Sequence, residues 1–351
     1  MSDGAAQGKP GSAMTLDIGE QPDALRRLLT EGSAAIGELA RVIRERRPRF
    51  VLLVARGTSD HAALYAKYLT EIRLGLPAGL ASPSTLTLYQ SRPDLRDVLV
   101  LAVSQSGGSP DLTGSVQAAR ECGALTVAVT NNPASQLAQA AEFHVDVLAG
   151  HERAVAATKT YTSELLALYL LLESVGAGES GGAAALPDLA EELISAAAAP
   201  VAAAAPRYRF AEQMLTTARG YAYSTAREAA LKLMETCYLS AQAFSGADLL
   251  HGPLALVDRG MPVIAVVQRG KTQRAIEEVL EKLIAGGGDL LVVGDAGLIP
   301  AAAHLPLPTV AEELTPILEI MPLQWLARDQ AVARGGNPDA PRGLKKVTET
   351  W

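Results

Sequence analysis

The chain has 351 residues, a net charge of −7 and 48% hydrophobic residues, whereas aromatic residues make up only 4%. This length and apolar content predict a globular protein with two domains of ordinary size. The acidic balance and the few aromatic residues lack the basic patch and stacking surfaces typical of nucleic-acid-binding proteins, so we expect no nucleic acid partner. No apolar stretch of about 18 residues is free of charges or helix breakers, and residues 1–13 lack a signal-like segment, which predicts a cytoplasmic protein with no membrane partner.

Apolar runs alternate with helical segments in the first half of the chain. We expect strands at residues 51–54, 98–103, 125–130 and 144–147, with a helix at 60–70 and a long apolar helix at 160–175. This alternation is typical of a doubly wound parallel sheet, so the sequence predicts an α/β fold.

The same pattern restarts after a segment rich in small residues. Glycine, alanine and serine dominate residues 176–185, and an alanine-rich linking helix follows to residue 205. The pattern resumes near residue 220, with a helix at 225–238 and strands at 263–267 and 290–293. The tripeptide Ala-Arg-Gly occurs at 55–57 and at 218–220, each time after a strand-like run, which indicates a duplicated unit. We therefore expect an N-terminal segment (1–30), a first domain (31–176), a linker (177–205), a second domain (206–335) and a C-terminal tail (336–351).

Two turns rich in hydroxyl groups follow strands of the first unit. One turn contains Ser104, Gln105, Ser106, Gly107, Gly108 and Ser109, and the other contains Gly57, Thr58 and Ser59. A turn of small residues between a strand and a helix leaves backbone N–H groups free, and the helix N-terminus adds positive potential, which together favour a phosphate. One such turn alone could be an ordinary loop. Two turns at the carboxyl ends of strands in one unit predict a single shared ligand there.

Candidates for acid–base chemistry lie in the second half. Lys232 and Glu235 are three residues apart on one face of a predicted helix, a spacing that also suits a solvated ion pair. His251 begins a His-Gly-Pro turn, which would fix the imidazole for proton transfer or for a hydrogen bond to the local backbone.

The remaining histidines and the cysteines do not suggest a metal site. His61, His144, His151 and His304 show no pairing in the sequence, and Cys122 and Cys237 lie within predicted helices without the spacing of metal ligands. We expect two buried thiols, no disulfide and no metal ligation.

Seven ordered segments beginning at residues 20, 57, 104, 157, 230, 251 and 341 read EQPDAL, GTS, SQSG, ATK, ALKLME, HGPLAL and PRGLKK. Together they resemble the sugar isomerase (SIS) family, in particular the isomerase half of glucosamine-6-phosphate synthase and the free-standing aminosugar-phosphate deaminases. The resemblance covers nearly the whole chain. It implies two tandem SIS domains, each a flavodoxin-like, doubly wound parallel sheet.

The resemblance also implies a phosphosugar substrate and a role for each matching residue. The phosphate would bind in the loops of Gly57, Thr58, Ser59, Ser104, Gln105, Ser106 and Ser109, where Ser109 replaces the usual threonine of the family. Glu235 would move a proton between C2 and C1, His251 would open the sugar ring, Lys346 would reach the carbonyl carbon, Lys232 would orient the open-chain sugar, and Glu152 would lie near the substrate. No cofactor is implied.

Two further features qualify these roles. In the family the histidine comes from a neighbouring subunit, which implies a homodimer with a shared active site. Lys345 and Lys346 are adjacent, and without the resemblance such a pair would suit a solvated basic tail equally well.

A difference from the synthase predicts the direction of the reaction. The synthase carries a glutaminase domain with an N-terminal cysteine nucleophile, whereas only the 30-residue N-terminal segment stands there in this chain and no cysteine precedes Cys122. The turn SGGSPD at 106–111 and the tail KVTET at 346–350 are also more similar to those of the deaminases. We therefore expect a deaminase that converts glucosamine 6-phosphate to fructose 6-phosphate and ammonia.

Other functions fit the same segments. A deglycase or isomerase could act on another phosphosugar amine, such as galactosamine 6-phosphate or a fructosyl-amino-acid 6-phosphate, with the same loops and base. A phosphosugar sensor would be expected to carry a DNA-binding segment and would not need Glu235, His251 and Lys346 together. A synthase half could also work with a separate glutaminase subunit.

Overall fold

The computed structural model describes residues 9–178, 180–297 and 299–346. These residues form two five-stranded sheets whose paired strands are all parallel, with strand orders β2-β1-β3-β4-β5 and β10-β9-β8-β6-β7. The strands are β1 (Phe50–Val54), β2 (Ala78–Leu80), β3 (Val98–Ser104), β4 (Leu125–Thr130), β5 (Phe143–Asp146), β6 (Gln213–Ala218), β7 (Ser240–Ser245), β8 (Pro262–Val267), β9 (Asp289–Gly294) and β10 (Ala303–Leu305).

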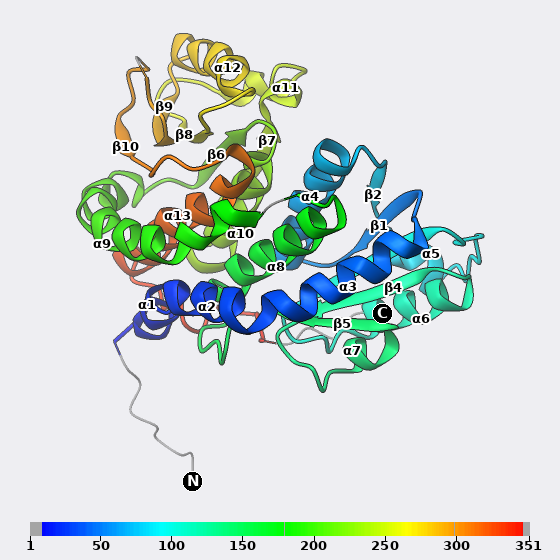
Figure 1. Cartoon of the computed structure of the whole chain (residues 1–351). Helices are drawn as coiled ribbons and strands as arrows, with labels where there is room; N and C mark the ends of the chain where they lie inside the picture. The colour runs from blue at the N-terminus through cyan, green and yellow to red at the C-terminus, as the bar shows by residue number, and fades with distance from the viewer. Residues whose placement is uncertain (1–8, 179, 298, 347–351) are drawn as a thin grey trace.

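Helices cover both sheets and fill the space between them (Figure 1). They are α1 (Ser12–Gly19), α2 (Gln21–Arg27), α3 (Ser33–Arg46), α4 (Thr58–Leu69), α5 (Pro83–Thr87), α6 (Pro110–Glu121), α7 (Gln136–Ala140), α8 (Lys159–Val175), α9 (Leu186–Ala204), α10 (Ala222–Cys237), α11 (Gly246–Leu249), α12 (Gln273–Ala285) and α13 (Thr315–Ala333). None of the helices in the described ranges is long and apolar enough to cross a membrane.

The predicted α/β class is confirmed, and the two sheets share one topology. In each sheet the first strand lies inside, the second strand pairs with one of its edges, and the third strand pairs with the other edge. Successive strands are therefore added first on one side of β1 and then on the other, and the same reversal of strand order occurs at β6 in the second unit. Loops at the carboxyl ends of the strands diverge at such a switch point and leave a crevice for a ligand.

The sequence predicted the long apolar strands and missed the short or polar ones. β2 and β10 have three residues each, and β7 reads SAQAFS, with no run of branched apolar residues. These three strands are held by pairing with a neighbour rather than by their own propensity. The prediction for Cys122 was also wrong, because α6 ends at Glu121 directly before it and its side chain is only partly buried, whereas Cys237 is buried as expected.

The long helices between the sheets form the centre of the molecule. Every residue of α8 from Lys159 to Glu173 is buried, which explains the apolar run at residues 165–172. Helices α4 and α10 pack against each other and connect the two units. The alanine-rich helix α9 packs on α2 and α13 and buries Leu186, Leu193 and Val201, so it contributes to the core as well as joining the units.

Replacement of Leu168 in α8 tests the importance of this central layer. Leu168 is fully buried, so Leu168→Ala should lower the free energy of unfolding by about 2–5 kcal/mol through lost burial and a residual cavity. Leu16 is 54% exposed, and Leu16→Ala should change the free energy of unfolding by no more than about 0.5 kcal/mol. Urea titration followed by circular dichroism measures both variants. Equal effects would contradict a core centred on α8.

Candidate active site

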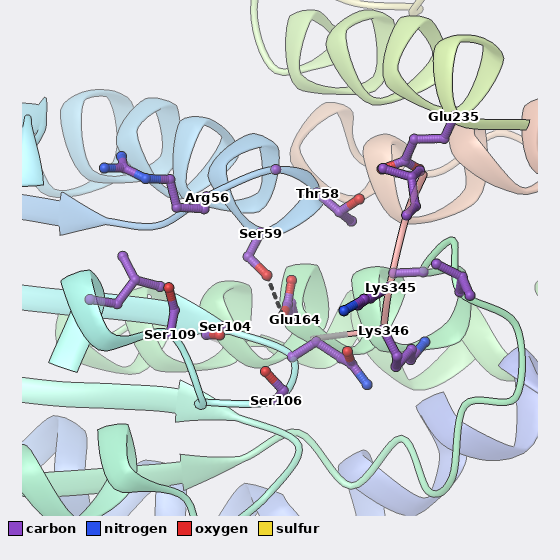
Figure 2. Close-up of a pocket in the computed structure, with 16 residues that line it drawn as sticks. Arg56, Thr58, Ser59, Ser104, Ser106, Ser109, Glu164, Glu235, Lys345 and Lys346 are labelled. Atoms are coloured by element: carbon purple, nitrogen blue, oxygen red, sulfur yellow. Dashed lines mark hydrogen bonds between the residues drawn. The ribbon is translucent and has the colours of Figure 1, made fainter. Parts of the chain in front are cut away.

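A cavity of about 340 Å³ lies where the loops after β1 and β3 face α10 and the C-terminal tail. Figure 2 shows serine side chains on one side of it, Glu235 reaching down from α10, and Lys345 and Lys346 on the tail beside it. The cavity is lined by Arg56, Gly57, Thr58, Ser59, Ser104, Gln105, Ser106, Ser109, Leu112, Val155, Ala157, Glu164, Glu235, Leu344, Lys345 and Lys346. Both hydroxyl-rich turns found in the sequence therefore line one cavity.

The turn after β3 is the predicted phosphate site, and we call it the anion cradle. The Gly107 N–H donates to Ser104 Oγ (3.2 Å) and the Gly108 N–H donates to Ser106 Oγ (3.3 Å), which curls the backbone around the ends of the hydroxyl side chains. Gly107 has a φ of +61°, a conformation that glycine adopts without strain. Helix α6 begins directly after Ser109, so its positive end points toward the same turn.

Arg56 adds a cation to the cradle that the site prediction did not include. Its guanidinium lies 2.8 Å from the Asp111 carboxylate in the first turn of α6, and it is partly exposed at the cavity wall. Arg56 belongs to the repeated tripeptide Ala-Arg-Gly. The sequence analysis used this repeat as evidence of duplication and did not assign Arg56 to the site. A phosphate in the cradle would lie within the field of this arginine.

Glu164 is a buried acid in the wall of the cavity that the sequence analysis missed. Ser59 Oγ donates to its Oε1 (2.9 Å), while its Oε2 has no hydrogen-bond partner. Burial raises the pKa of Glu164 well above its usual range and so favours the neutral form of this side chain. It was missed because α8 reads as a core helix and neither of its two glutamates, Glu164 and Glu173, belongs to a motif.

Lys232 and Glu235 belong to a buried ion cluster, which we define as His61, Glu228, Lys232 and Glu235. The Lys232 ammonium lies 2.5 Å from Glu235 Oε2 and 3.3 Å from Glu228 Oε1, and it donates to Thr58 Oγ1 (3.1 Å). The Lys232 side chain is 0% exposed, so the interpretation of a solvated ion pair is wrong. Burial by itself disfavours the ammonium, but the two carboxylates outweigh it and raise the pKa of Lys232.

His61 completes this cluster from the first unit. Its Nδ1 lies 2.7 Å from Glu228 Oε2, a partner that the sequence did not indicate. The partner is 167 residues away in the sequence, which no local pattern reveals. Thr58 Oγ1 also donates to Glu228 Oε1 (3.1 Å), so two side chains of α4, Thr58 and His61, contact the carboxylates and ammonium of α10.

The C-terminal tail brings Lys346 to the cavity. Lys346 Nζ donates to the Ala154 carbonyl (2.5 Å) and lies 3.7 Å from Glu152 Oε2. Burial lowers the pKa of Lys346, so a larger share of this amine is neutral than for an exposed lysine. Glu152 itself does not line the cavity, since it is buried behind it and accepts hydrogen bonds from the N–H and the hydroxyl of Thr158. Residues 347–350 of the predicted tail motif lie outside the described residues.

His251 is the predicted site residue that the structure does not bring to the cavity. It lies on an exposed turn after α11 and is absent from the cavity wall. The other predicted residues line the cavity or contact a residue that does. Among the described residues, no group of three or more histidine, cysteine, aspartate or glutamate side chains could hold a metal ion.

The SIS domain family model matches residues 46–174 and 208–334, which are the two α/β units. The chain belongs to the SIS domain family. Its curated relatives include the isomerizing glutamine–fructose-6-phosphate aminotransferases of Pyrococcus horikoshii (33% identical over 95% of this chain and 57% of the relative) and of Symbiobacterium thermophilum (36% identical over 97% and 59%). This SIS chain thus spans under two thirds of the length of these relatives.

Solved structures of the SIS family extend the similarity. A candidate phosphosugar isomerase from Silicibacter pomeroyi is 33% identical, with a TM-score of 0.83 over 93% of this chain and 99% of that chain. A glucosamine-6-phosphate deaminase from Thermotoga maritima has a TM-score of 0.80 over 97% and 100%, but at 22% identity it shows the shared fold alone. The resemblance drawn from the seven sequence segments is confirmed.

A substitution at Gly107 tests the anion cradle. A Cβ atom at residue 107 would overlap the Ser135 side chain, and the positive φ disfavours any residue with a Cβ, so Gly107→Ala should displace the turn. We expect the affinity for inorganic phosphate, measured by calorimetry, to fall at least about tenfold, the equivalent of 1.4 kcal/mol.

The matched control is Gly37→Ala in the interior of α3. A Cβ there meets no atom within 4 Å, and the change should stabilise the helix by about 0.5–1 kcal/mol without altering phosphate affinity. Unchanged phosphate binding by Gly107→Ala would show that the turn after β3 is not the anion site.

Proposed function

We propose that this SIS chain converts glucosamine 6-phosphate and water to fructose 6-phosphate and ammonia in the cavity between β1, β3 and α10. The observation that carries the proposal is the presence, in one cavity of about 340 Å³, of an anion cradle on one side and the carboxylate of Glu235 on another. That volume suits a small ligand such as a phosphorylated hexose. A phosphate in the cradle would anchor the sugar and leave C1 and C2 to extend toward Glu235.

The proposed chemistry is a proton transfer between neighbouring carbons. In the open-chain sugar the aldehyde at C1 acidifies the proton on C2, which the Glu235 carboxylate removes to give an enolamine. The same carboxyl group returns the proton to C1, and the C2 amine becomes a ketimine. Water adds to the ketimine carbon and ammonia leaves, so that fructose 6-phosphate remains.

The buried ion cluster suits Glu235 to this task. The ammonium of Lys232 lies 2.5 Å from Glu235 Oε2 and stays charged, so it offsets the negative charge of the carboxylate that accepts the C2 proton. Lys232 also fixes the position of the Glu235 carboxylate, because Glu228 and Thr58 hold the lysine in place. Glu235 keeps 22% of its side chain exposed and faces the cavity.

Lys346 supports chemistry at the carbonyl carbon. Its lowered pKa increases the fraction of neutral amine, and only a neutral amine attacks a carbonyl to form an imine with loss of water. The Ala154 carbonyl holds the amine at the edge of the cavity. Lys346 could therefore bind or activate the open-chain carbonyl.

Ring opening requires a proton donor and acceptor, which we assign to His251 of a second copy. Within one chain His251 lies on an exposed turn outside the cavity. A homodimer in which each copy presents this turn to the other copy's cavity would complete both sites. The names of the curated relatives describe isomerizing aminotransferases of fructose 6-phosphate, which supports the same carbon–carbon proton transfer on the same sugar phosphates.

Release of ammonia from glucosamine 6-phosphate by the purified chain tests this proposal. We expect release with glucosamine 6-phosphate and a loss of kcat of at least about 10²-fold in Glu235→Gln, because the amide cannot accept the proton. Glu278→Gln on the exposed face of α12 is the control and should keep full activity. Release of ammonia from galactosamine 6-phosphate alone would show that this sugar, and not glucosamine 6-phosphate, is the substrate. No release from either sugar would contradict the deaminase assignment.

Mixing two inactive variants tests the shared site. Glu235→Gln and His251→Asn should each be inactive alone, whereas in an equimolar mixture heterodimers would contain one site with both residues intact. Random exchange should restore about a quarter of the wild-type activity. A mixture of Glu235→Gln with Glu235→Gln/His251→Asn, which cannot form an intact site, is the control. No recovery after complete subunit exchange would contradict a histidine supplied by the second copy.

A further inference from the structure

The second SIS unit contains its own cavity, of about 150 Å³, at the carboxyl ends of β8 and β9. Gln268, Arg269, Asp295, His304, Thr309 and Glu319 contribute to its wall. The loop after β10 and the first turns of α13 close it. None of these residues lines the first cavity, so the two cavities are distinct.

A buried acid occupies corresponding places in the two units. Glu164 lies on α8, the helix after the fifth strand of the first unit, and Glu319 lies on α13, the helix after the fifth strand of the second. Ser59 on α4 donates to Glu164 (2.9 Å), and Thr225 on α10, the corresponding helix of the second unit, donates to Glu319 (2.7 Å). Both acids are at most 1% exposed, and each has one oxygen without a partner. Both units have thus retained a buried glutamic acid, bound by a hydroxyl group, in the wall of a cavity.

The anion cradle has not been kept in the same form. The turn after β8, at the place of the serine turn after β3, is already occupied by the chain's own Glu312 carboxylate. The Lys271 N–H donates to Glu312 Oε2 (3.2 Å) and the Thr272 hydroxyl donates to Oε1 (3.3 Å). A Cβ on Gly270 would lie 2.5 Å from Glu312 Cδ, which shows how closely the carboxylate approaches the turn. A phosphate would have to displace this carboxylate.

Two buried oxygen atoms in the wall of the second cavity have no hydrogen-bond partner. Glu319 Oε1 and Gln268 Oε1 are both buried, and neither accepts a hydrogen bond. The Arg269 guanidinium is already bound by Asp295 (2.7 Å) and by Thr309 (3.2 Å). A buried acceptor without a donor costs about 1–3 kcal/mol, so a ligand that donates hydrogen bonds at this place is favoured.

We propose that this cavity is a second binding site, for a small unphosphorylated amine such as an amino sugar, whose ammonium group donates to Glu319 and Gln268. A cation matches the acid better than a neutral hydroxyl does. Burial raises the pKa of Glu319 to about 7, and a neighbouring ammonium would stabilise its ionised form and create an ion pair. A cavity of about 150 Å³ encloses a molecule of about six heavy atoms, so it would hold the amine-bearing part of the sugar. The remaining hydroxyl groups would extend to the rim, where Thr309 and His304 are exposed.

Calorimetric titration with glucosamine and with glucose tests the proposal, because the two sugars differ only in the group at C2. We expect glucosamine to bind the full chain at pH 7 at least about tenfold more tightly than glucose, a difference of 1.4 kcal/mol or more. Glu319→Gln places an amide N–H₂ where the acceptor oxygen lies and should weaken glucosamine binding by a similar factor. Thr309→Trp fills the cavity from its exposed rim without altering the core and should do the same.

Ser106→Ala in the first cavity is the matched control and should leave glucosamine affinity unchanged. Thermal unfolding of each variant confirms that it is folded. Equal affinity for glucose and glucosamine, loss of binding in Ser106→Ala but not in Glu319→Gln, or no glucosamine binding to the wild-type chain would each overturn the proposal. The readout is binding without turnover, so a failure of the proposed deaminase reaction would not imitate any of these results.

Discussion

The packing of α4 against α10 depends on one buried positive charge, the ammonium of Lys232. An ammonium without partners in this position would cost several kcal/mol, and here Glu228, Glu235 and Thr58 surround it. Thr58 belongs to the first unit, whereas the lysine and both carboxylates belong to the second. The two carboxylates on the same helix neutralise the charge, and the Thr58 hydroxyl completes its hydrogen bonds only when the two units are joined. The same contact presents Glu235 to the cavity of the first unit.

The C-terminal tail is tied to both units in a similar way. The Arg342 N–H donates to the Tyr238 hydroxyl of the second unit (2.9 Å), and the Arg342 guanidinium stacks over the ring of that tyrosine. Lys346 is bound by the Ala154 carbonyl of the first unit. These contacts turn a short basic segment into one wall of the cavity. Burial against that wall lowers the pKa of the Lys346 amine.

The two units show how duplication permits different chemistry on one topology. The strand orders match, and both units retain a buried glutamic acid under the carboxyl ends of their strands. The first unit has a turn of serine hydroxyl groups after its third strand, whereas the second fills the corresponding turn with the carboxylate of Glu312. The turn in the first unit is thus suited to a phosphate from a ligand. The corresponding turn in the second unit already binds the carboxylate of Glu312.

The sequence by itself determined the α/β class, the duplication, the family and the two hydroxyl-rich turns, because apolar periodicity and short ordered motifs are local properties of the chain. It did not reveal β2, β7 and β10, which depend on pairing with a neighbouring strand, or Glu164, which sits in a helix that reads as core. Only the tertiary structure decided that Lys232 is buried rather than solvated, that His61 contacts Glu228, and that Glu152 lies behind the cavity. Each of these facts rests on burial or on a contact between residues distant in the sequence, and the charge state of an ionisable side chain follows from such surroundings rather than from the residue type.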